Sequence, residues 1–115
     1  MRLKSEIWVK GYIRRCEVQL VSAFVVRRGQ RDAGAIYVRI NRLDGTSLIF
    51  GPAPAGLDGG AEDRFWSPCL EGAAVSDADA DAYLARQAEF DSDLWVIEIE
   101  DPDGRHFLGE ALVDP

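Results

Sequence analysis

The chain has 115 residues, which suits one domain, and its 47% hydrophobic and 29% charged residues exclude a disordered protein. No apolar run approaches the roughly 20 residues that cross a membrane, and the apolar stretch in the opening MRLKSEIWVKG is too short for a signal peptide. We therefore expect a single domain, residues 1–115, that is cytoplasmic and has no membrane partner.

The formal net charge of −7 is unevenly distributed along the chain. Residues 1–43 hold ten of the thirteen basic residues and three acidic ones, whereas residues 44–115 hold seventeen acidic residues. Such asymmetry indicates either a charged surface for a partner or two halves that neutralise each other within the fold. The sequence leaves both readings open.

The first half of the chain predicts a helix and two strands. Apolar residues recur at helical spacing from Val9 to Leu20, and Ser5 is placed to cap the helix start, although Gly11 weakens this prediction. Residues 22–28 are rich in β-branched and aromatic side chains and predict a strand. Residues 29–34 predict a turn, and residues 35–43 alternate as a second strand.

Asp44-Gly45 predicts a tight hairpin between residues 35–43 and a third strand. A two-residue loop would place Ile40 opposite Ile49, so that both lie on one face. The following stretch, GPAPAG, resembles a phosphate loop only in its glycines, because its prolines lack the backbone N–H groups that hold a phosphate. We expect a Gly/Pro elbow over residues 51–60.

The second half predicts an edge strand, a helix and a final hairpin. Pro68 limits FWSPCL, residues 65–70, to an edge, and Ser76 caps a helix that runs to about residue 90. Residues 94–100 alternate as a strand, and DPDG, residues 101–104, predicts a turn that returns residues 105–113 as its partner, with Arg105 opposite Glu100.

Together these elements predict an α+β fold: an antiparallel sheet of about four or five strands with two helices packed on one face. The expected core consists of Trp8, Ile13, Val25, Ile36, Val38, Ile40, Ile49, Trp95, Ile97 and Ile99.

Catalytic and metal-binding patterns are weak in this sequence. Cys16 and Cys69 lack zinc-ligand spacing and are read as reduced, partly buried thiols, with a redox pair as the alternative. The acids of residues 77–81 begin like a calcium loop but lack its glycine and final glutamate. The single histidine, His106, is read as a half-buried strand residue, with a small enzyme centred on it as an alternative. We expect no cofactor, no metal and no assigned catalytic residue, so an enzyme is not favoured.

Arginines form the clearest candidate site. Three of them surround a predicted hairpin tip in RRGQR, residues 27–31, and the full candidate set is Arg27, Arg28, Arg31, Arg39 and Arg42. Guanidinium groups bind carboxylates in a bidentate way, so we expect a docking surface for an acidic protein partner or for the acidic half of a second copy. The alternatives are an ordinary solvated hairpin with internal ion pairs and a single-stranded nucleic-acid surface made by Tyr37, Arg39, Asn41 and Phe50. The sequence pI of about 4.6 counts against nucleic acid.

Three separated segments also carry a family resemblance. LKSEIWVKGYIRRC, VVRRGQRDAGAIYVRINRLDGTSLIFGPAPAG and FDSDLWVIEIEDPDGRHFL together resemble the small bacterial proteins of domain of unknown function 1491. The resemblance extends from residue 2 to about residue 108. It implies a stand-alone, single-domain bacterial protein without an established activity, and it supplies no site residues.

Overall fold

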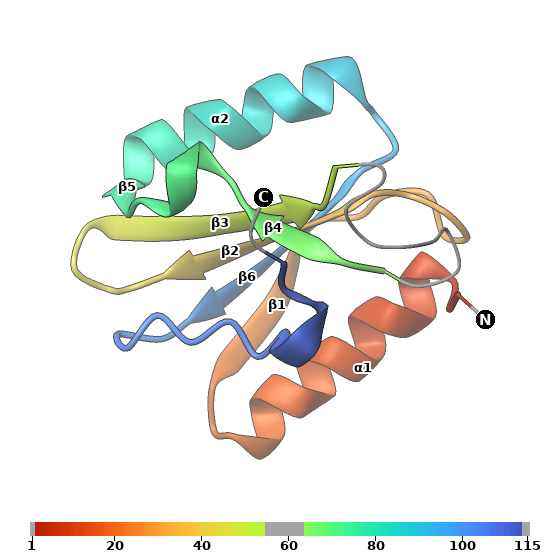
Figure 1. Ribbon diagram of the computed structural model, residues 1–115, viewed down its shortest axis with the longest axis horizontal. Helices are drawn as coiled ribbons and strands as arrows, with labels where there is room; N and C mark the ends of the chain where they lie inside the picture. The colour runs from red at the N-terminus through yellow and green to blue at the C-terminus, as the bar shows by residue number, and fades with distance from the viewer. Residues whose placement is uncertain (1, 55–63, 114–115) are drawn as a thin grey trace.

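The computed structural model describes residues 2–54 and 64–113 (Figure 1). Its helices and strands, in chain order, are α1 (Ser5–Val18), β1 (Ser22–Arg27), β2 (Ile36–Asn41), β3 (Thr46–Pro52), β4 (Trp66–Pro68), β5 (Val75–Ser76), α2 (Asp77–Phe90) and β6 (Trp95–Glu100). Short 3₁₀ turns lie at Leu70–Gly72 and Gly109–Ala111. No helix in these two ranges is long and apolar enough to span a membrane. The elbow expected over residues 51–60 lies in part outside the described residues.

The six strands form one sheet in the order β1-β6-β2-β3-β4, and β5 pairs with β3. All neighbours are antiparallel except β2 and β6, which pair in parallel. The α+β prediction is confirmed, with this one parallel pair as a departure from a purely antiparallel sheet. Since β6 lies between β1 and β2, residues 28–35 are a crossover and the expected hairpin tip is not a hairpin.

The two helices cover opposite faces of the sheet, as Figure 1 shows, so the prediction of one shared face was wrong. Central strand β6 gives the reason, because its consecutive residues Trp95, Val96 and Ile97 are all buried. Ile97 belongs to the core cluster that contains Val9 of α1, and Val96 belongs to the cluster that contains Leu84 of α2. A strand that is apolar on both sides needs a covering layer on each.

The β2–β3 hairpin is displaced by one residue from the predicted register. Ile40 lies opposite Leu48, and the N–H of Arg42 donates to the carbonyl of Thr46 at 3.0 Å, so that three residues rather than two form the loop. Leu43 begins this loop with φ of 62°. Because side chains alternate along a strand, the one-residue change moves Ile49 to the α2 face, away from Ile40.

The segment after β6 does not return as a strand. Both edges of β6 are occupied, by β1 and β2, so residues 105–113 have no free edge there. They lie instead over the α1 face, where Leu108 is buried in the core and the N–H of Val113 donates to the carbonyl of Trp66 at 2.8 Å. Arg105 pairs with Asp101 rather than lying opposite Glu100.

The predictions for the helix caps and for the core are each confirmed in part. Ser76 caps α2 by accepting the N–H of Asp79, as predicted, but Ser5 lies inside α1 and its buried hydroxyl donates to the carbonyl of Gly34 at 2.7 Å. Most of the predicted core is buried or packed against it, but Val25 is 40% exposed because β1 is an edge strand.

Candidate binding site

Arg39 is not a surface residue. It lies on the α2 face of β2, only 7% exposed, and its Nε donates to the buried Ser47 hydroxyl at 3.1 Å. Its guanidinium group also pairs with Asp77 and Asp81 of α2 and, at 3.8 Å, with Glu98 of β6. Three acids from the second half of the chain therefore neutralise this arginine inside the fold.

The expected nucleic-acid surface is not assembled either. Tyr37 and Asn41 share the α2 face with Arg39, and the Tyr37 hydroxyl faces Gln87 of α2 at 3.4 Å. Phe50 lies on the opposite face of the sheet, 7% exposed in the α1 core. These aromatic rings therefore do not form a joint stacking platform.

The remaining predicted arginines lie at two ends of the molecule. Arg42 follows β2, whereas residues 28–35 precede it, so six strand residues, roughly 20 Å, separate them. Arg27 ends β1 and donates to the carbonyl of Ser92 at 3.1 Å, and its Nε is buried. Only Arg28 and Arg31 of the predicted set are close together and well exposed.

These two arginines surround Glu6 near the start of α1. Arg28 contacts the Glu6 carboxylate, while Arg31 Nε and Lys10 Nζ each lie 3.7 Å from it. The backbone holds the loop against the helix, because the N–H of Glu6 donates to the carbonyl of Arg31 at 2.9 Å. Nearby, Lys4 pairs with Asp32 at 3.7 Å. We call Lys4, Lys10, Arg28 and Arg31 the basic rim.

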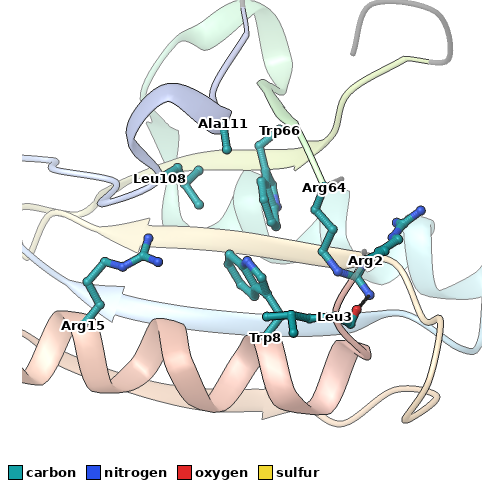
Figure 2. A pocket seen from close by; sticks show the side chains of 8 residues that line it. All are labelled: Arg2, Leu3, Trp8, Arg15, Arg64, Trp66, Leu108 and Ala111. Carbon is teal, nitrogen blue, oxygen red and sulfur yellow. Dashed lines mark hydrogen bonds between the residues drawn. The ribbon is translucent and has the colours of Figure 1, made fainter. Parts of the chain in front are cut away.

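An arginine- and tryptophan-lined cavity of about 300 Å³ opens beside the same helix (Figure 2). Trp8 and Arg15 reach it from α1, Trp66 from the start of β4, and Arg64 from just before that strand. In Figure 2 the two tryptophans lie at the centre, with Arg15 on one side of them and Arg2 and Arg64 on the other. Leu3, Leu108 and Ala111 complete the lining.

Arg64 is the most constrained cation of the cavity. Its Nη2 donates to the carbonyl of Leu3 at 3.0 Å and to the Ser5 hydroxyl at 2.9 Å. Burial, together with the nearby positive charge of Arg2, lowers the pKa of Arg64 to about 10. Its Nε is buried and has no hydrogen-bond partner within residues 2–54 and 64–113. The cavity therefore favours a negative charge beside Arg64.

Sequence reasoning missed this cavity. The one sequence signal that could have pointed to it is Arg64 itself, one of only three basic residues in the acidic half of the chain. Trp66 was assigned to an edge strand, which β4 confirms, but nothing local indicated that its ring would meet Trp8 of α1 at 4.4 Å between centroids. The contact joins residues 58 positions apart.

Comparison with known proteins places the chain in a family. Residues 3–109 match the sequence pattern of the family described as "Protein of unknown function (DUF1491)". The chain belongs to this family. A DUF1491 protein from Caulobacter crescentus CB15, solved by crystallography, is 40% identical with a TM-score of 0.79, over 98% of this chain and 99% of that one. Protein Atu0922 from A. tumefaciens, solved in solution, is 38% identical with a TM-score of 0.79, over 100% of this chain and 98% of its own. No curated protein matches the chain.

His106 of this DUF1491 chain is half-buried in the segment after β6, rather than on a strand. Its Nδ1 accepts the N–H of Leu108 at 2.9 Å, and its ring meets Phe50 edge-on at 5.4 Å between centroids. Burial lowers the pKa of His106 below its ordinary 6.5. The ring does not line the cavity of Figure 2, so the two features are separate.

Both cysteines of the DUF1491 chain are free thiols. Cys16 is fully buried and Cys69 is half-buried, and burial raises the pKa of both. Within the described part of the chain, no group of three or more His, Cys, Asp or Glu side chains is placed to hold a metal ion.

Proposed function

We propose that this protein is a non-catalytic interaction module that docks an acidic polypeptide segment on its basic rim. The observation that carries the proposal is the charge around Glu6, whose single carboxylate is shared by Lys10, Arg28 and Arg31. These three cations remain well exposed, so an incoming carboxylate can replace water around them at little cost. Such a patch recruits an acidic partner and orients it.

An acidic protein fits this surface better than a nucleic acid does. The whole chain carries a formal charge of −7, so a long polyanion would be repelled outside the rim. A short acidic segment meets only the rim. In addition, Tyr37 and Phe50 lie on opposite faces of the sheet and supply no common surface on which bases could stack.

The structure indicates which arginines to change in a test. Arg27 has a buried Nε, so its replacement would disturb packing. Arg28→Gln with Arg31→Gln removes two exposed charges instead, and surface ion pairs of this kind are worth about 0–1 kcal/mol each. The matched control is Arg42→Gln with Arg86→Gln, which removes the same charge from the far end of β2 and from an exposed position on α2, both outside the rim.

Binding of a short fluorescent poly-L-glutamate peptide at low salt is the first measurement, with a single-stranded oligonucleotide of matched charge as the comparison probe. We expect poly-L-glutamate to bind the unaltered protein and the control, and the rim variant to lose about tenfold in affinity. Equal binding by the two double variants, or stronger binding of the oligonucleotide, would refute the proposal. Capture from lysate with the same two variants would then identify the natural partner.

A further inference from the structure

The cavity of Figure 2 is built from cations and apolar groups. Its charged lining is Arg2, Arg15 and Arg64, and the rest is Leu3, Trp8, Trp66, Leu108 and Ala111. No acidic side chain of the described ranges lines it. A volume of about 300 Å³ is at the lower end of the range for small-molecule sites, which combine apolar walls with a few convergent polar groups.

Arg64 provides the reason to expect an anion. Arg64 is partly buried, and its Nε is buried without a hydrogen-bond partner among the described residues. Removing a guanidinium group from water is costly unless hydrogen bonds or negative charge compensate. The acceptors that Arg64 does reach, the Leu3 carbonyl and the Ser5 hydroxyl, are neutral, and the Arg2 charge nearby opposes its own. A carboxylate or phosphate beside Arg64 and Arg2 would supply the missing negative charge in the geometry that guanidinium groups bind best.

The tryptophans provide the reason to expect an apolar body on that anion. Trp8 is stacked on Tyr12 at 4.9 Å between ring centroids, and its ring also packs against that of Trp66 at 4.4 Å. The Trp66 indole N–H donates to the carbonyl of Ile36 at 3.2 Å, which fixes that ring. The rings are therefore ordered before any ligand arrives, and the entropy cost of binding is reduced.

We propose that this cavity binds a small organic anion, with its carboxylate or phosphate group at Arg64 and Arg2 and its apolar body against Trp8 and Trp66. Arg15 lies seven residues after Trp8 on α1, roughly 10 Å along the helix axis, and completes the positive lining at the other end. Binding here does not require the basic rim.

The test separates the two parts of the ligand. Benzoate and phenyl phosphate carry both an anion and a ring, acetate and inorganic phosphate carry the anion alone, and benzyl alcohol carries the ring alone. Titration calorimetry and the indole N–H signals in ¹H–¹⁵N NMR report binding. We expect benzoate or phenyl phosphate to bind about tenfold more tightly than any of the three partial probes. The Trp8 and Trp66 signals should shift more than that of Trp95, which lies outside the cavity lining.

Adjacent arginines on α1 supply a matched pair of variants. Arg15 lines the cavity and Arg14 does not, so Arg15→Gln should weaken benzoate binding while Arg14→Gln leaves it unchanged. Arg2→Gln tests the anion end, where we expect a loss of about tenfold or more. Arg64→Gln tests the same end but also removes a contact to the Ser5 hydroxyl, so Arg2→Gln remains informative if Arg64→Gln fails to fold.

Two results would overturn the inference: ring-bearing anions that bind no more tightly than acetate and phosphate, or cavity variants that bind benzoate like the unaltered protein. The rim variant Arg28→Gln with Arg31→Gln should retain benzoate binding. Its loss of poly-L-glutamate binding alone would leave the cavity untouched, so each proposal can fail without the other.

Discussion

Replacement of Arg39 by methionine should destabilise the fold strongly, because this arginine is the centre of a partly buried ion network. The Arg39 side chain is 9% exposed, and it contacts Asp77, Asp81 and Glu98. Methionine fills much of the same space but leaves the carboxylates without a counter-charge and the buried Ser47 hydroxyl without its donor.

The expected magnitude follows from the burial of each partner. Removal of one member of a buried ion pair costs about 3–5 kcal/mol, whereas an exposed pair costs about 0–1 kcal/mol. The Asp81 side chain is 69% exposed, so its pair with Arg39 counts as an exposed one. The Glu98 side chain is 15% exposed, so its pair with Arg39 counts as a buried one. We therefore expect about 3 kcal/mol for Arg39→Met, at the lower end of the buried range, and less than about 1 kcal/mol for Asp81→Asn.

Urea unfolding followed by tryptophan fluorescence measures both changes. The midpoint should fall while the slope of free energy against urea stays constant, and the melting temperature should fall by roughly 4 °C per kcal/mol. Arg86→Met, on the exposed side of α2, is the matched control and should stay within about 0.5 kcal/mol of the unaltered protein. A cost below about 1 kcal/mol for Arg39→Met would show that the network does not stabilise the fold.

Three further predictions concern pH and backbone conformation. Hydrogen bonds from Arg105 lower the pKa of Asp101, so Asp101→Asn should destabilise the fold fully at pH 7. This cost should shrink as the pH falls below about 3.9, the unfolded-state pKa, and through the lower folded-state pKa. An equal cost at pH 7 and pH 3 in urea unfolding would contradict this. Burial lowers the pKa of His106, so the contribution of this residue to the free energy of unfolding is full above pH 6.5 and declines as the pH falls toward its folded-state pKa. An NMR titration of the ring should give a pKa below 6.5, and a value at or above 6.5 would contradict the burial argument. Leu43 holds φ of 62° while 57% exposed, so Leu43→Gly should raise the free energy of unfolding by roughly 0.5–1 kcal/mol in urea, whereas a loss would show that its side chain packs.

Elements with strong local signals could be predicted from the sequence, and their arrangement could not. Ser76 with acids in the next turn predicted the start of α2, and the alternation of residues 94–100 predicted β6. The position of β6 between β1 and β2 depends on pairing between segments more than fifty residues apart, which no local pattern encodes. The same strand shows why one helix was assigned to the wrong face, since a period-two reading treats Val96 as outward.

The hairpin register was missed for a conformational reason. Asp-Gly usually occupies both central positions of a two-residue turn, but here Leu43 takes the first left-handed position and Gly45 the second, with φ of 62° and 89°. A leucine rarely adopts that conformation, so the sequence pattern favours the shorter loop. The resulting one-residue change accounts for the misplacement of Ile49.

The uneven charge of the chain has different explanations at Arg39, within the central strand β2, and at the basic rim. Arg39 is neutralised by Asp77, Asp81 and Glu98, all from the acidic half, as expected if the two halves interleave. Among the described residues, the cations around Glu6 pair with the Glu6 carboxylate, which belongs to the same basic half of the chain. Neutralisation across the fold therefore explains Arg39, and a partner surface remains the proposal for the basic rim alone.

Helix α1 keeps the basic rim and the cavity apart although it contributes to both. Glu6 and Lys10, four residues apart, lie on one side of the helix, and Trp8 and Arg15, seven residues apart, lie on another. Two residues correspond to about 200° around a helix, so Lys10 and Trp8 point in nearly opposite directions. A change on one side therefore leaves the other intact. An acidic polypeptide on the rim and a small organic anion in the cavity can then be tested independently, and both can bind at once.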